Sequence, residues 1–249
     1  MVHFGVEFAV ITGANSGIGL ETTKKYLSLG HHVYAISRNV DVLINLNAEY
    51  SESLHVHRCD VSKVHELETF YSALSSRDIK IDILIANAGI AVTEELTNVT
   101  EKSFEASFDI NVKGLFFTVQ KSLPLLGDGA SIALIGSIQS NRGSGPWAIY
   151  GATKAAVRSL TRSFSQELGS KGIRVNCLSP GVTETPILEK FGYEDDVLKD
   201  VISHVKANTP LGRLATSKEI ANSICFICSD EASFINGVDL QVDGGLAQI

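Results

Sequence analysis

The sequence predicts an α/β fold in which a doubly wound parallel sheet carries helices on both faces. Short, continuously apolar segments alternate with helical patterns along the whole chain. Strands that read as continuous apolar runs are typical of parallel sheets, because both faces of such a sheet are covered. No repeat of fixed period and no linker rich in Pro, Gly or Ser divides the 249 residues. We therefore expect a single domain over residues 1–249.

The expected strands alternate with helices in chain order. They cover residues 8–12, 32–36, 54–58, 81–86, 130–135, 173–178 and 238–242. The first helix is expected over 16–29, because the following Gly30 is a typical helix stop. Further helices are expected from near Ser62, over 103–123 and over 148–168. In such folds ligands bind beyond the carboxyl ends of the strands, where the strand order reverses.

The composition excludes several classes of function. The 21 Lys and Arg residues and the 28 Asp and Glu residues give a net charge of −7, which disfavours general binding to nucleic acid or to an anionic membrane. No apolar run approaches the ~20 residues that span a bilayer, and the first residues lack the pattern of a signal peptide. We therefore expect a cytoplasmic protein that acts on a small molecule.

The cysteines and histidines do not predict a metal site. Four cysteines are too few for a disulfide scaffold of this length. Cys225 and Cys228 form a C-x-x-C pair, but the residues before them read as a buried helix, in which a thiol acts as a small apolar side chain. His55 and His57 share one face of an expected strand without a third ligand.

A glycine-rich loop joins the first expected strand to the first helix. It reads Thr12-Gly13-Ala14-Asn15-Ser16-Gly17-Ile18-Gly19. Glycine lets the chain turn tightly and lets its backbone approach a pyrophosphate, and the N–H groups at a helix N-terminus attract phosphate. The loop therefore predicts a dinucleotide site, to which we assign Gly13, Asn15, Ser16, Gly17, Ile18 and Gly19.

The end of the second strand indicates which dinucleotide binds. A site for NAD(H) usually has Asp or Glu there, which holds the ribose 2′-hydroxyl. Here the strand ends in Ile36-Ser37-Arg38, and the next acidic residue is Asp41. An arginine can pair with a 2′-phosphate or stack on adenine. We therefore expect Ser37 and Arg38 to contact the cofactor and favour NADP(H) over NAD(H).

Two further strand ends carry candidate cofactor contacts. Asp60 and Val61 follow the third strand, where the carboxylate could accept from the adenine amino group, cap the following helix, or do both. The small residues Asn87, Ala88 and Gly89 follow the fourth strand and would let the chain pass beside the adenine ribose.

Tyr150 and Lys154 predict proton transfer chemistry. Their i, i+4 spacing places the phenol and the ammonium on one helix face. Hydride transfer between an alcohol and a nicotinamide also moves a proton on oxygen. The neighbouring Lys154 cation and the nicotinamide charge are together expected to lower the pKa of the phenol towards the working pH. Ser137, just after the fifth strand, could hydrogen-bond the reacting oxygen as it gains charge.

These motifs together closely resemble the short-chain dehydrogenase/reductase family, in its single-domain branch of about 250 residues. The resemblance spans Phe8 to Gly245 and rests on the following motifs: Thr12-Gly13-x-x-x-Gly17-x-Gly19, Asn87-Ala88-Gly89, Asn111, Ser137, Tyr150-x-x-x-Lys154, Pro180-Gly181 and Val242-Asp243-Gly244-Gly245. It implies a Rossmann-like sheet of seven strands and NAD(P)-dependent redox chemistry on carbonyl and alcohol groups.

The resemblance also implies the roles of individual residues. Tyr150 would be the acid/base, Ser137 its partner on the substrate oxygen, and Lys154 a ribose ligand that tunes the phenol. Asn111 would belong to a water relay that reaches Lys154. The residues expected to meet the nicotinamide or the phosphates after the sixth strand are Pro180, Gly181, Val182 and Thr185.

The substrate is expected to be a neutral, partly apolar ketone or secondary alcohol. The segment of about 186–213 should form a flap over the site, since long connections of this kind often act as lids. The expected pocket residues are mostly apolar or aromatic: Ser137, Gln139, Trp147, Tyr150, Ile187 and Phe191.

Two alternatives remain at this stage. A 3-oxoacyl-carrier-protein reductase is related by pattern, but Leu125-Leu126-Gly127-Asp128-Gly129 lacks the basic residues that would dock an acidic carrier. A redox sensor that binds NADP(H) without turnover is disfavoured because the set of Asn111, Ser137, Tyr150 and Lys154 is complete.

Two helices carry more apolar surface than one sheet face can cover. On the helix over 103–123, Phe104, Phe108, Leu115 and Val119 are expected on one side, extended by Val112, Phe116 and Leu123. The next helix presents small residues, including Gly151, Ala152 and Ala155. Paired with a symmetry mate, these helices predict a four-helix interface. With a second interface formed by 242–249, they predict a homotetramer.

Overall fold

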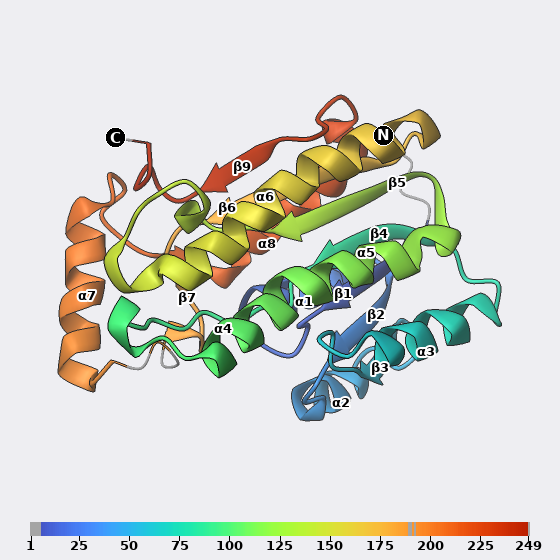
Figure 1. Ribbon diagram of the computed structural model, residues 1–249. Coiled ribbons are helices and arrows are strands. Elements are labelled where there is room, and N and C mark those ends of the chain that lie inside the picture. Colours follow the sequence, from blue (N-terminus) through green and yellow to red (C-terminus); the bar gives the residue numbers. More distant parts are fainter. Residues whose placement is uncertain (1–5, 189–190, 192, 249) are drawn as a thin grey trace.

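The computed structural model describes residues 6–188, 191 and 193–248, and its centre is a parallel sheet of seven strands in the order β3-β2-β1-β4-β5-β6-β9. Helices cover both faces of this sheet, as the sequence predicts (Figure 1). The strands are β1 (Phe8–Thr12), β2 (His32–Ser37), β3 (Leu54–Arg58), β4 (Ile81–Ala86), β5 (Leu126–Ile135), β6 (Arg174–Pro180) and β9 (Asp239–Val242).

The helices form two layers because successive strand residues point to opposite faces of the sheet. Val10 packs under the layer of α3, α5 and α6, whereas its neighbour Ile11 packs under α1, α2 and α8. The helices are α1 (Gly17–Ser28), α2 (Asp41–Asn47), α3 (Val64–Ser75), α4 (Glu101–Phe108), α5 (Leu115–Ser122), α6 (Ala148–Leu168), α7 (Asp195–Asn208) and α8 (Ser217–Cys228).

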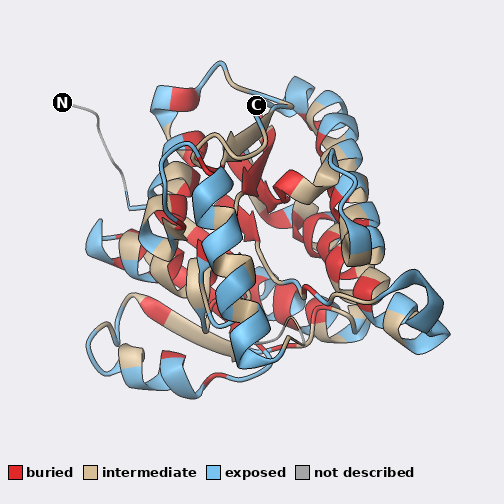
Figure 2. Cartoon of the chain, turned by 90° about the vertical axis from the view of Figure 1, so that its left-hand side faces the viewer, coloured by how far each residue is buried: buried red, intermediate tan, exposed pale blue. Residues whose placement is uncertain are grey.

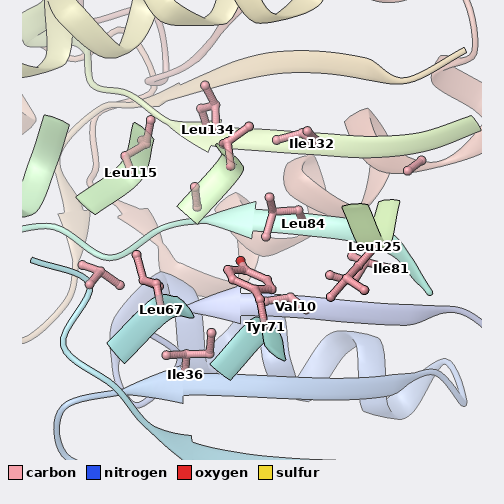
Figure 3. Packing of buried hydrophobic residues seen from close by; sticks show 14 of the residues in the cluster. Val10, Ile36, Leu67, Tyr71, Ile81, Leu84, Leu115, Leu125, Ile132 and Leu134 are labelled. Atoms are coloured by element: carbon pink, nitrogen blue, oxygen red, sulfur yellow. The ribbon is translucent and has the colours of Figure 1, made fainter. Parts of the chain in front are cut away.

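The buried side chains gather between these layers. Figure 2 shows that burial is concentrated on the strands and on the inner sides of the helices. On one face, Leu67 and Tyr71 of α3 lie over Val10 and Ile36 of the sheet (Figure 3). On the other face, α8 contributes Cys228, and both Cys225 and Cys228 are free thiols within this helix.

The strand order reverses between β1 and β4. β1 pairs with β2 on one side and with β4 on the other, and all neighbouring strands are parallel. A crevice therefore opens at the carboxyl ends of β1 and β4, where ligands bind in sheets of this topology. The loops that follow β1, β4, β5 and β6 all begin at this edge, and α7 lies across it (Figure 1).

The helix predicted over 103–123 is interrupted. It begins earlier, at Glu101, because the side chains of Thr100 and Ser103 form a capping box. A π-helical segment over Asp109–Gly114 then separates α4 from α5. The inserted turn changes which side chains share a face, so the predicted alignment of Phe104 with Leu115 is wrong. Phe104 is 46% exposed, whereas Leu115 is 4% exposed and packs against the sheet.

Several predicted boundaries also move. β5 begins at Leu126 rather than at residue 130, β6 covers Arg174–Pro180, and β9 begins at Asp239. α3 begins at Val64, two residues after the predicted start. The reason is that the Asp60 carboxylate accepts hydrogen bonds from the backbone N–H and the hydroxyl of Ser62 and fixes a turn before the helix.

A second, two-stranded sheet was not predicted. β7 (Thr183–Glu184) pairs in parallel with β8 (Ala215–Thr216). Two-residue strands carry no periodic pattern that a sequence could reveal. This small sheet brings together the two ends of the segment over 186–213, so that the segment leaves and re-enters the fold at one place.

Candidate active site

The loop after β1 adopts a conformation that requires glycine. Gly13 and Gly17 have φ values of +65° and +50°, a region that side chains disfavour. A Cβ atom at Gly19 would lie 2.2 Å from the carbonyl oxygen of Gly13. The N-terminus of α1 therefore packs directly on the end of β1, which fits a site for a pyrophosphate.

Side chains from two strands close this loop. The Thr12 hydroxyl accepts hydrogen bonds from the backbone N–H groups of Asn87 and Ala88, each at 3.0 Å. The Asn87 amide in turn donates to the carbonyls of Thr12 and Gly13, at 3.0 and 3.2 Å. These bonds join the ends of β1 and β4, so the Asn87 side chain holds the glycine loop in place.

The end of β2 lies beside the same loop. The Ser37 hydroxyl donates to the side-chain oxygen of Asn15 at 2.7 Å, and Arg38 follows directly as an exposed side chain. Asp60 follows the neighbouring strand β3, but one of its carboxylate oxygens is bonded to Ser62. Asp60 thus forms a turn, and its predicted role as a helix cap is wrong, because the N-cap of α3 is Lys63 and no side chain caps this helix.

Ser137, Tyr150 and Lys154 converge at the end of β5. Ser137 is buried and accepts from the backbone N–H of Gln139 at 3.2 Å, and its hydroxyl lies close enough to the Tyr150 phenol to favour the ionised form. The Lys154 ammonium donates to the carbonyl of Ile135 at 2.7 Å and lies 5.7 Å from the centre of the Tyr150 ring. The residues that the sequence assigned to catalysis therefore lie together.

Burial changes the proton affinities of this group. Desolvation raises the pKa of Tyr150 above its ordinary value, and the nearby Ser137 hydroxyl only partly offsets this. The predicted lowering of this pKa includes the nicotinamide charge and remains a prediction, whereas in the protein alone burial outweighs the effect of Ser137. Desolvation also lowers the pKa of Lys154 to about 8.

Asn111 ties the loop after β4 to helix α6. Its side-chain oxygen accepts from the N–H of Ile90 at 2.9 Å, and its amide donates to the Ile90 carbonyl at 2.9 Å and to the Thr153 hydroxyl at 3.1 Å. A Cβ atom at Gly89 would lie 3.2 Å from this Asn111 oxygen and 3.6 Å from the Lys154 ammonium. Asn111 thus lies close to Lys154, and the predicted water relay remains a prediction.

A cavity of about 910 Å³ opens beside these residues. Trp147 lies on its wall, with its ring 5.5 Å from that of Tyr150 and 4.8 Å from that of Phe191. The other predicted residues on the wall are Ile18, Asn87, Gly89, Ser137, Gln139, Lys154, Pro180, Gly181, Val182, Thr185 and Ile187.

The remaining predicted cofactor residues lie outside this cavity, at the ends of β1 to β4. Val61 packs against Gly114 of the π-helical segment, and Ala88 packs against Gly13. Thr185 lies between the two regions. It lines the cavity, and its methyl group would be only 3.0 Å from a Cβ atom placed on Gly17. A bound dinucleotide would therefore extend from β2 past Gly17 to Tyr150.

The sequence predicted a flap over residues 186–213 but not which of its side chains form the outer wall of the cavity. Helix α7 contributes Leu198, Val201 and Val205, whose spacing places them on one helix face. Arg142 and Leu246 complete this wall with His204 and Asn208. The predicted pocket was apolar and aromatic, whereas this end of it is also polar. The helical spacing within α7 was the one signal that could have revealed the apolar part.

The geometry agrees with the comparisons to known proteins. A family model described as enoyl-(acyl carrier protein) reductase matches residues 13–247. An oxidoreductase of Sarocladium schorii is 33% identical over 243 residues, with 97% of this chain and 96% of the relative covered. A 3-oxoacyl-[acyl-carrier-protein] reductase of Thermotoga maritima is 31% identical, with 95% and 96% covered. The chain belongs to the short-chain dehydrogenase/reductase family.

The solved structures of this family have the same fold. A short-chain dehydrogenase/reductase from Brucella melitensis, described as a glucose/ribitol dehydrogenase, superposes with a TM-score of 0.90 at 33% identity and covers 96% of each chain.

A sorbitol-6-phosphate 2-dehydrogenase of Klebsiella pneumoniae is 32% identical. The chain is therefore an oxidoreductase of the kind that acts on alcohol and carbonyl groups with a nicotinamide cofactor. Within the described part of the chain, no helix is both long and apolar enough to span a membrane.

Proposed function

We propose that this enzyme transfers a hydride between NADP(H) and a ketone or secondary alcohol, with Tyr150 as the acid/base. The observation that supports this proposal is the convergence of Ser137 and Tyr150 at the wall of the cavity, with the Lys154 ammonium 5.7 Å from the centre of the phenol ring. No other group of described residues joins a proton donor, a second hydroxyl and a buried cation on the wall of this cavity.

Each of the three side chains has a distinct task. The bound cofactor supplies or accepts the hydride. The Ser137 hydroxyl donates a hydrogen bond to the substrate oxygen as negative charge develops there. Tyr150 delivers its phenolic proton to that oxygen during reduction and takes it back during oxidation. Lys154 stabilises the phenolate that proton delivery leaves behind, because its charge is held within 5.7 Å of the ring.

The residues at the strand ends fit the cofactor. The glycine loop and the α1 N-terminus would hold the pyrophosphate, and Ser37 and Arg38 would hold the phosphorylated ribose. Lys154 would also bind the nicotinamide ribose, with Pro180, Gly181, Val182 and Thr185 near the nicotinamide. Asp60, Val61, Asn87, Ala88 and Gly89 would line the adenosine half.

The cavity supports a substrate with an apolar body. Trp147, Ile187 and Phe191 form an aromatic and aliphatic wall near Tyr150. We propose that the segment of about 186–213, which includes α7, is the substrate flap of a single catalytic domain. The four free thiols fit the reducing cytoplasm that we expect.

A carrier-bound 3-oxoacyl substrate is the alternative, since the Thermotoga maritima relative carries that name. The stretch over 125–129 has no basic side chain with which to dock an acidic carrier protein. We therefore favour a free small-molecule carbonyl. Comparing 3-oxoacyl groups on a carrier protein with the same groups as small thioesters would distinguish the two.

Replacing Tyr150 tests the assignment of the acid. In a panel of ketones followed by cofactor oxidation, we expect Tyr150→Phe to lower kcat by at least ~10²-fold, the lower range for a positioned proton donor. Cofactor affinity should change by no more than a few fold, because the phenyl ring retains its packing. A Phe variant with turnover near that of the wild type would refute the role of Tyr150.

The pH dependence follows from Lys154. Its pKa of about 8 means that the side chain is cationic below this pH and loses its charge as the pH rises through it. Because the neutral amine cannot stabilise a phenolate, we expect kcat/KM for carbonyl reduction to fall as the pH rises through about 8. A profile that stays level up to the ordinary ionisation of a phenol, at about pH 10, would contradict this.

Arg38 decides the choice of cofactor. Arg38→Ala should weaken NADPH binding by about ten- to a hundredfold, the effect of losing a charge-assisted hydrogen bond of ~1.5–3 kcal/mol. NADH binding should change little, because NADH lacks the 2′-phosphate. Arg77→Ala, at an exposed arginine just after α3, is the control. Fluorescence titration that shows the wild type preferring NADH would overturn the assignment.

We also propose a homotetramer of D₂ symmetry. Phe104 and Phe108 stack at 4.6 Å on α4, and the small residues Ala152 and Ala155 lie on an exposed face of α6. A four-helix contact would cover both. The second predicted interface uses 242–249, of which Ile249 lies outside the described residues.

Light scattering measures this assembly directly. We expect four times the mass of the 26.8 kDa chain and, for Ala155→Arg, a reduction to half of that, because a long cation blocks close approach of the helices. A wild-type mass near that of one chain would refute the assembly, and a dimer would leave only one interface.

A further inference from the structure

Two loops of the active site are joined into one platform. The N–H of Glu94, in the loop after β4, donates to the carbonyl of Pro146, in the turn before α6, at 3.0 Å. The base of the first loop is fixed by the bonds from Asn111 to Ile90. Thr93 and Trp147, which neighbour Glu94 and Pro146 in the sequence, are therefore held side by side.

Both side chains of this platform contact the same residue of the flap. The Thr93 hydroxyl donates to the backbone carbonyl of Phe191 at 2.6 Å. The Trp147 ring meets the Phe191 ring edge-on, at 4.8 Å and 90°. Phe191 is thus held by contacts to both its backbone and its side chain. It lies about 100 residues from Thr93 in the sequence.

Helix α7 of the flap has little packing of its own. Within Asp195–Asn208, no residue of α7 is buried, and its apolar face lies along the cavity. The far end of the flap is fixed, since the N–H of Leu211 donates to Gly244 and Arg213 pairs with Glu219 at 2.6 Å. The near end is held to the active site at Phe191, on the side where Tyr150 lies.

We propose that Thr93 is a positioning residue that latches the substrate flap over Tyr150. Its hydrogen bond places the Phe191 ring against Trp147, whose own ring lies 5.5 Å from that of Tyr150. Closing the flap here completes the apolar wall that a substrate contacts and shields the phenol from water. The substrate step rests on the proposed function, whereas the latch itself does not.

The single tryptophan makes the latch directly observable. Trp147 is the only tryptophan in the chain, so acrylamide quenching of its fluorescence reports how well Phe191 covers it. We expect Thr93→Val, which keeps the shape and removes the donor, to make Trp147 more accessible to acrylamide. Thr93→Ser, which keeps the donor, should resemble the wild type. Thr69→Val, at an exposed threonine on α3, is the matched control.

A double variant tests the route through Phe191. Phe191→Leu should also increase quenching, because the perpendicular ring contact is lost. If Thr93 acts by placing Phe191, then adding Thr93→Val to Phe191→Leu should increase quenching little further. Quenching of Thr93→Val equal to that of the wild type, or fully additive effects in the double variant, would overturn the latch.

Kinetics test the consequence for the substrate. With the ketone that the wild type reduces best in the panel, we expect Thr93→Val to raise KM about fivefold, which corresponds to a hydrogen bond of ~1 kcal/mol, and to change kcat less. An unchanged KM would overturn the link between latch and substrate binding. If no ketone is reduced, the proposed function fails, and the quenching series still decides the latch.

Discussion

The active site depends on one buried ammonium group. Lys154 is 5% exposed, and burying a charge costs several kcal/mol unless the charge is paired or hydrogen-bonded. The carbonyl of Ile135, the last residue of β5, accepts its hydrogen bond at 2.7 Å. This bond fixes α6 against the end of β5. Ser137 lies two residues beyond the end of β5, and Tyr150 lies one helical turn before Lys154 on α6. The hydroxyl groups of Ser137 and Tyr150 are therefore brought close together.

The other strand ends are held in the same way, by side chains that satisfy backbone groups. Thr12 and Asn87 join β1 to β4, and Asn111 joins the loop after β4 to α6. Backbone groups at these ends have no partner in the sheet ladder, and leaving them unpaired would be costly. The polar side chains that bind them also shape the crevice to which we assign the cofactor and the substrate. Under the proposed function, the same residues contribute to both stability and activity.

Much of this arrangement could be predicted from the sequence, because its signals are local. The apolar runs located the seven strands, the glycine spacing located the loop after β1, and the Tyr150–Lys154 spacing located the helix that carries the proposed acid/base. The π-helical segment around Asn111 could not be predicted. It differs from an α-helix only in which backbone groups are hydrogen-bonded, and the amino-acid composition of the segment does not reveal that difference. The misplaced alignment of Phe104 with Leu115 follows from that segment alone.

The cavity wall and the proton affinities depend on contacts that are distant in the sequence. Arg142, α7 and Leu246 come from three separate segments and meet only in the folded chain. The raised pKa of Tyr150 in the protein alone could not be predicted, because the sequence shows a neighbouring lysine but does not show burial. Both depend on how distant segments pack together, which is a property of the whole fold rather than of a motif.

The most direct test of the central claim is the ionisation of Tyr150 itself. The phenolate absorbance of the wild type minus that of Tyr150→Phe, followed against pH with and without NADP⁺, reports this single group. We predict ionisation above pH 10 in the protein alone and at a lower pH with NADP⁺ bound, because the cofactor brings a positive ring beside the phenol. Ionisation at the same pH in both states would contradict the assignment of Tyr150 as the acid/base.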